Sequence, residues 1–136
     1  MVNTLISKIR FAAVVACCFV ATSALAEGLG GSFTGEVTQN EPPQTFPMEM
    51  NLYGPVGNIS YPTLRCAGNL AFLRSDGTTY WYRETITHGR DACIDGGTIE
   101  IRPHALGGST NWEWRWSKDD IVVRGVVRGA GAPDRR

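Results

Sequence analysis

Hydrophobic and polar residues alternate in short runs along most of the chain. Met48, Met50 and Leu52, for example, alternate with Glu49 and Asn51. A period of two places successive side chains on opposite faces, so these runs predict β-strands with one apolar face. Turn residues separate the runs. The pattern predicts eight strands: Ser32–Thr38, Phe46–Tyr53, Val56–Tyr61, Cys66–Arg74, Thr78–Thr87, Gly97–Pro103, Asn111–Ser117 and Ile121–Arg128.

The connections between these runs are mostly short, as at Tyr53-Gly54-Pro55 and Ser75-Asp76-Gly77. Short connections predict that strands adjacent in sequence pair antiparallel in a meander. Because each strand has one apolar face, a single sheet wrapped around one core fits the pattern. We therefore expect an all-β domain, a closed or nearly closed barrel of about eight strands without exposed edges. A two-sheet sandwich is the alternative, because alternation alone does not separate the two.

The first 26 residues have a different character. Lys8 and Arg10 precede an apolar run over Phe11–Val20, and Ala24-Leu25-Ala26 supplies small residues. This order is typical of a cleavable secretory signal, and the run is too short to span a membrane. We predict cleavage after Ala26. A lipoprotein site at Cys17 is a weaker alternative, because the apolar run continues beyond it.

The predicted organisation is thus a signal peptide at 1–26, one barrel-like domain at 27–128 and a disordered tail at 129–136. Two further segments, Glu27–Gly31 and Gln39–Gln44, are expected to be a flexible flank and a polar loop.

Signal removal changes both the charge and the cysteine count. The full chain has 13 basic and 13 acidic residues, and losing two basic ones leaves 11 against 13, a net charge of −2. A near-neutral domain has no general electrostatic reason to bind nucleic acid or anionic membranes. Cys66 and Cys93 remain, and we expect them to form one disulfide in the periplasm or outside the cell. Such a bridge stabilises a fold by roughly 3 kcal/mol.

Three tryptophans, Trp112, Trp114 and Trp116, recur with a period of two and so share one face of a strand. They could form an aromatic platform for a sugar, a peptide or a partner protein. We favour the other interpretation, that they line the barrel, because Glu113 and Arg115 then face water.

A second candidate group is Tyr80, Tyr82 and Glu84, which point inward if Ile86 does. A buried carboxylate costs several kcal/mol unless it is paired or hydrogen-bonded. We expect Glu84 at the barrel rim, held by an arginine, a tyrosine hydroxyl or backbone N–H groups. The alternative is a functional carboxylate in a binding pocket.

The sequence contains no recognisable catalytic constellation. His88 and His104 lie beside turns, away from any ligand spacing with the cysteines. No nucleophile elbow or base-orienting spacing marks a serine. We therefore expect no enzymatic activity, no metal and no cofactor.

One longer pattern carries a resemblance. Residues 57–70 read G-x-I-x-Y-P-x-L-x-C-x-G-x-L, followed by E-x-I-x-x-G at 84–89 and C-I-D-G-G at 93–97. This resembles small exported bacterial all-β domains of uncharacterised function, also found at the extracytoplasmic end of some signalling proteins. The resemblance implies the fold and the Cys66–Cys93 bridge, and no activity. In architecture alone, the chain is similar to periplasmic inhibitors of proteases and lysozymes, which are small single-disulfide barrels.

These observations favour a non-enzymatic exported binding protein of the bacterial cell envelope. Its partner would be a protein, with an inhibitor or immunity-type role against a hydrolase, contacted through Gln39–Gln44 and Thr87–Asp91. The alternative is a binder of small molecules or glycans that uses the barrel aromatics. Neither nucleic acid nor a membrane span is expected, and the location is periplasmic or secreted.

Overall fold

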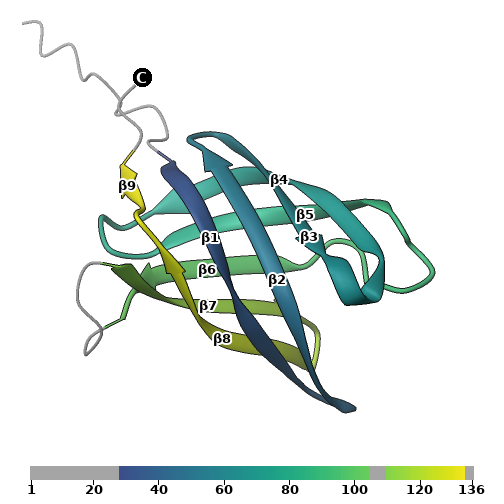
Figure 1. The fold of residues 1–136 in the computed structure, drawn as a ribbon. Coiled ribbons are helices and arrows are strands. Elements are labelled where there is room, and N and C mark those ends of the chain that lie inside the picture. The colour runs from purple at the N-terminus through teal and green to yellow at the C-terminus, as the bar shows by residue number, and fades with distance from the viewer. Residues whose placement is uncertain (1–27, 105–109, 134–136) are drawn as a thin grey trace, which may run out of the picture.

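The computed structural model describes residues 28–104 and 110–133, and eight of its strands close into an antiparallel barrel (Figure 1). The predicted barrel is confirmed, and the sandwich alternative is wrong. The predicted signal at 1–26 lies outside the described residues. The elements are β1 (Leu29–Asn40), β2 (Pro43–Tyr53), β3 (Val56–Tyr61), η1 (Pro62–Leu64), β4 (Cys66–Ser75), β5 (Tyr80–His88), β6 (Thr98–Pro103), β7 (Asn111–Lys118), β8 (Ile121–Gly129) and β9 (Ala132–Pro133).

The barrel closes through β1. Strands β2 to β8 pair in sequence order as a meander, and β1 pairs antiparallel with both β2 and β8. The pairing of β1 with β2 runs from Gly30 opposite Tyr53 to Asn40 opposite Pro43. Closure leaves no free edge between the eight barrel strands, as the uniform one-sided alternation predicted.

Two expectations about the start of the domain are wrong. Glu27–Gly31 was predicted as a flexible flank, but β1 begins at Leu29, whose side chain is fully buried in the core. Gln39–Gln44 was predicted as a polar loop, but both strands continue into it and only Glu41 and Pro42 form the turn. Its polar residues sit at the barrel end, where the alternating pattern of the strands no longer needs apolar side chains.

The end of the domain also differs from the predicted disordered tail. Gly129 is the last residue of β8, and Ala132–Pro133 forms the short strand β9 against Leu29 and Gly30. Strand β1 begins at Leu29, whereas its pairing with β8 reaches only to Phe33. The first residues of β1 therefore have a free edge, with which β9 pairs. Gly131 packs closely on the Phe33 ring, where an added Cβ would lie 2.5 Å from Cζ. Residues 134–136 lie outside the described part of the chain.

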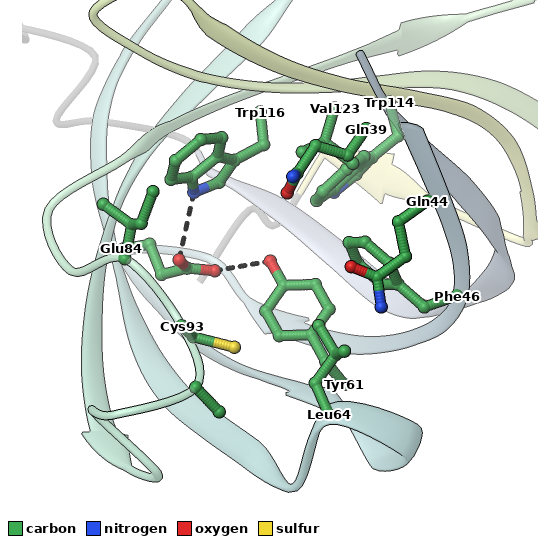
Figure 2. A pocket seen from close by; sticks show the side chains of 12 residues that line it. Gln39, Gln44, Phe46, Tyr61, Leu64, Glu84, Cys93, Trp114, Trp116 and Val123 are labelled. Carbon is green, nitrogen blue, oxygen red and sulfur yellow. Dashed lines mark hydrogen bonds between the residues drawn. The ribbon is translucent and has the colours of Figure 1, made fainter. Parts of the chain in front are cut away.

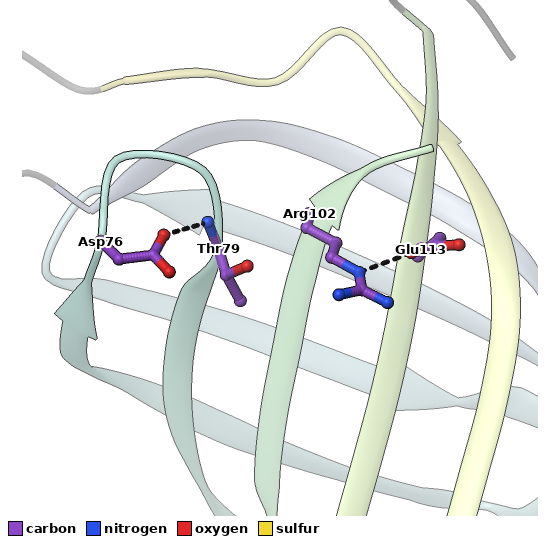
Figure 3. Close-up of polar contacts among 4 residues, drawn as sticks. All are labelled: Asp76, Thr79, Arg102 and Glu113. Carbon is purple, nitrogen blue, oxygen red and sulfur yellow. Dashed lines mark hydrogen bonds and ion pairs between the residues drawn. The ribbon is translucent and has the colours of Figure 1, made fainter. Parts of the chain in front are cut away.

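The turn between β4 and β5 delays the start of β5 from the predicted Thr78 to Tyr80. The Asp76 carboxylate accepts hydrogen bonds from the backbone N–H groups of Thr78, at 2.9 Å, and Thr79, at 2.8 Å. Figure 3 shows the bond from Thr79. These bonds lower the pKa of Asp76, because they favour the charged form. The residues are therefore held in a turn before the ladder begins.

The interior contains the apolar face of every barrel strand. Phe33, Met50, Ile86, Ile99 and Trp114 are examples of fully or almost fully buried side chains from five strands. The outer face contains ion pairs, with Arg102 on β6 bound to Glu113 on β7 (Figure 3) and Arg115 bound to Glu100. Among the described residues, no helix has the length and apolar character needed to cross a membrane.

The predicted disulfide is present between Cys66, at the start of β4, and Cys93, in the loop between β5 and β6. The two Cα atoms are 6.3 Å apart, within the range for a bridge. The bridge therefore fixes the β5–β6 loop to the barrel wall.

Candidate functional site

One end of the barrel contains a cavity of about 200 Å³, which we call the barrel-end cavity (Figure 2). An apolar cavity of roughly 150 Å³ is enough to hold a benzene ring, so this one has room for a small ligand group. It lies at the end marked by the β1–β2 turn, η1 and the β5–β6 loop. Its lining residues are Gln39, Gln44, Phe46, Tyr61, Leu64, Glu84, Ala92, Cys93, Ile94, Trp114, Trp116 and Val123.

Glu84 is the charged residue of this lining. The alternation of β5 turns its side chain inward between Tyr82 and Ile86, and it is only 1% exposed. The Tyr61 hydroxyl donates a hydrogen bond to Oε2 at 2.6 Å, and Trp116 Nε1 donates one to Oε1 at 3.0 Å (Figure 2). Glu84 is thus a buried carboxyl with both oxygens hydrogen-bonded, which agrees with the expected tyrosine partner.

Burial raises the pKa of Glu84 to about 7, because a charged carboxylate is poorly solvated inside the barrel. The hydrogen bonds from Tyr61 and Trp116 lower the pKa and so offset part of this effect, while nearby Asp95 raises it. Burial, followed by the charge on Glu84, raises the pKa of Tyr61 well above 10.0. Near neutral pH the cavity therefore contains a carboxyl that can change its charge.

Trp114 contributes a different polar group. Its side chain is 1% exposed, and its Nε1–H has no hydrogen-bond acceptor among the residues that the structure describes. A buried donor without a partner costs about 1–3 kcal/mol. Because this atom is also closed to solvent, the cost belongs to the packing of the core.

The β5–β6 loop forms one wall of the cavity through Ala92, Cys93 and Ile94. Besides the disulfide, its position is fixed by Asp95, whose side chain accepts a 2.7 Å hydrogen bond from the Ile86 N–H. Lys118 Nζ donates to the Asp95 carbonyl at 2.7 Å. This wall is therefore held to β4, β5 and β7 by covalent and polar contacts.

The structure divides the residues that the sequence singled out. Glu84, Trp114 and Trp116 come together in the barrel-end cavity. The three tryptophans are at most 6% exposed, so they line the barrel as predicted and do not form an external platform. Trp114 and Trp116 belong both to the hydrophobic core and to the wall of the cavity.

The other three candidates do not line this cavity. Trp112 packs edge-on against Phe33, and its Nε1 donates to the Gly129 carbonyl at 3.1 Å. The Tyr82 hydroxyl accepts a hydrogen bond from the Leu29 N–H at 2.7 Å and donates one to the Gly54 carbonyl at 3.0 Å. Tyr80 is buried within the core. In the structure, these three side chains pack in the barrel interior outside the cavity lining.

Sequence reasoning did not identify Tyr61 and Phe46 as site residues, and it named Gln39 and Gln44 only as the ends of a loop that contacts a partner protein. Alternation placed Phe46 on the same inward face as Met48, so its burial could have been read from the sequence. Tyr61 was part of the recognised pattern but received no role. Its contact with Glu84 crosses the barrel interior from β3 to β5, and local patterns do not reveal such contacts.

In residues 28–104 and 110–133, no group of three or more His, Cys, Asp or Glu side chains could hold a metal ion. Comparisons with known proteins gave no match to a protein-family model, a curated protein or a solved structure. The resemblance noted in the sequence therefore stays a prediction.

Proposed function

We propose that this domain is a non-enzymatic binding protein and that the barrel-end cavity receives one small ligand group. The observation that carries the proposal is the buried Glu84 carboxyl at the wall of an open cavity. A carboxyl that served only the core would be expensive compared with an apolar residue of similar size. A few polar groups placed in a mostly apolar cavity are typical of a small-molecule site.

The side-chain amides of Gln39 and Gln44 support the same proposal, because they add polar groups to the cavity lining beside Glu84. Aromatic side chains make up a third of the lining, namely Phe46, Tyr61, Trp114 and Trp116. The resulting wall suits a compact apolar group with one or two polar atoms, such as a ring or a branched alkyl group.

The test is a titration with four water-soluble probes: benzyl alcohol, cyclohexanol, choline and 3,3-dimethylbutan-1-ol. Binding is followed by the indole ¹H–¹⁵N resonances of Trp114 and Trp116, which lie in the cavity wall. We expect at least one probe to shift both resonances in a saturable way. The absence of any saturable shift across the panel would refute the proposal.

A matched pair of variants locates the binding. Gln44→Phe places a larger side chain in the cavity lining, whereas Thr45→Phe places the same side chain on the outer face of β2. We expect Gln44→Phe to weaken probe binding and Thr45→Phe to leave it unchanged. Equal effects would place the bound probe elsewhere on the barrel.

A second candidate function is an inhibitor or immunity-type protein that binds a hydrolase of the cell envelope. It is favoured by the exposure of Ile94, 44%, in the loop at the cavity wall, where a partner could cover it. The test is affinity capture from an envelope extract, comparing wild type with Ile94→Asp. Capture of a hydrolase by wild type alone supports this candidate, and equal capture by both proteins contradicts it.

Export to the periplasm or the cell exterior belongs to the same proposal. The Cys66–Cys93 disulfide supports it, because such bridges persist in oxidising compartments. Mass measurement of the protein from an envelope fraction tests it, with a chain beginning at Glu27 as the expected result. A full-length chain retained in the cytoplasm would contradict it.

A further inference from the structure

The lining of the barrel-end cavity has charge of one sign only. Glu84 is its one acidic residue, and none of the twelve lining residues is Lys, Arg or His. The hydrogen bonds to Glu84 come from Tyr61 and Trp116, which are uncharged donors. Within the described part of the chain, no cationic side chain forms an ion pair with this carboxyl. When Glu84 ionises, two neutral hydrogen-bond donors stabilise its charge, and no cationic side chain of the described residues is paired with it.

The titratable and charged groups around Glu84 do not change this conclusion. Tyr61 on β3 is protonated near neutral pH, and Asp95 in the β5–β6 loop would add negative charge. Lys118, at the end of β7, donates to the Asp95 backbone carbonyl and not to Glu84. Among the described residues, the ionised Glu84 carboxylate therefore has no positive side chain bound to it.

The remaining walls suit the same kind of group. Phe46 from β2, Tyr61 from β3, and Trp114 and Trp116 from β7 surround the cavity with aromatic rings. The faces of aromatic rings attract organic cations, and cavities with several aromatic walls are used to bind quaternary ammonium groups. A carboxylate among such rings adds a direct electrostatic attraction.

We propose that the barrel-end cavity binds a small organic cation, an ammonium group on a compact apolar body, with the ammonium beside Glu84 and the aromatic walls. The inference rests on the proposed function, because it names the ligand class for the same cavity. A cation would supply the charge that the lining lacks, and its apolar body would contact Leu64 and Val123.

The experiment compares choline with 3,3-dimethylbutan-1-ol, which has the same shape without the charge, by calorimetry and by the Trp116 indole resonance. At about pH 8, where Glu84 is largely ionised, we expect choline to bind at least about tenfold more tightly than the alcohol. At about pH 5.5, where Glu84 is largely protonated, we expect most of this preference to disappear.

Glu84→Gln tests the role of the carboxyl and is compatible with the fold, because the amide oxygen can accept from Trp116 while the amide nitrogen donates to the Tyr61 hydroxyl. We expect this variant to keep only the smaller preference for choline that the aromatic walls provide, and to show the same preference at both pH values. Glu49→Gln, the same change at an exposed position on β2, is the matched control and should keep the preference for choline.

The outcomes separate this inference from the proposed function. Equal or tighter binding of the alcohol in wild type, or binding of cyclohexanol or benzyl alcohol without choline, overturns the cation inference and leaves the cavity a ligand site. A choline preference in Glu84→Gln as large as that of wild type at about pH 8 also overturns it. Failure of all four probes overturns both.

Discussion

The buried Glu84 carboxyl makes the stability of this barrel depend on pH in an unusual direction. Its pKa is about 7 in the folded protein, against an ordinary value of 4.5. Between these two values the folded protein holds a proton that the unfolded chain has released. The free energy of unfolding therefore falls as the pH rises through this window, and the contribution levels off above about pH 7.

The size of the effect follows from the two pKa values. Their difference corresponds to about 3 kcal/mol, a large part of the stability of a small domain. Other carboxylates titrate in the same range, and Asp76 acts in the opposite sense because its pKa is lowered. The informative quantity is therefore the difference between wild type and Glu84→Gln, in which the contributions of the shared groups cancel.

The assay is urea unfolding, followed by tryptophan fluorescence with the disulfide intact, at several pH values from about 4 to about 8. We expect the stability of wild type relative to Glu84→Gln to fall by about 3 kcal/mol over this range. Glu49→Gln, at an exposed site, should show no such trend relative to wild type. A flat difference for Glu84→Gln, or one that rises with pH, would mean that Glu84 is ionised in the folded barrel and would refute the reasoning.

Three further changes test the same structure. Tyr61→Phe removes a donor from Glu84, so the pKa of Glu84 should rise above about 7; ¹³C NMR titration of the carboxyl measures this, and an unchanged pKa would contradict the role of the hydrogen bond. Gly97→Ala should destabilise the fold by more than about 1 kcal/mol and shift the Trp116 indole resonance, since the new methyl would lie 2.0 Å from Trp116 Nε1; a native-like melt and spectrum would contradict it. Replacing Cys66 and Cys93 together with alanine should cost roughly 3 kcal/mol in urea unfolding, and a midpoint equal to wild type would show that the bridge adds nothing.

Alternation predicted most of the fold because it reports the face on which each residue lies. It placed Met48, Met50 and Ile99 inward, and all three are buried. It could not report which strand edges meet, so barrel and sandwich were left open until the pairing of β1 with both β2 and β8 was seen. The boundary errors at Leu29 and Gly129 arose because small and glycine-rich segments have little pattern, although backbone pairing extends into them.

The candidate site was predictable only in part, for a related reason. The register of β5 turned Glu84 inward, and the need to satisfy a buried carboxyl predicted a partner of the kind that Tyr61 provides. The identity of that partner depends on how β3, β5 and β7 are staggered around the barrel, because Tyr61 and Trp116 reach Glu84 across the interior. Strand stagger is a property of the closed sheet and has no local signature.

The pairing of β9 with β1 has a practical consequence for protein engineering. Pro133 lies opposite Leu29 and Ala132 opposite Gly30, so a short linker could join these two points and make the barrel backbone continuous. The chain could then be opened in the β4–β5 turn, where Gly77 has no neighbouring atoms within 4 Å of an added Cβ. A circularly permuted barrel of this kind would keep all the strand pairings of the eight-stranded barrel. Neither of its new chain ends would lie at the barrel-end cavity.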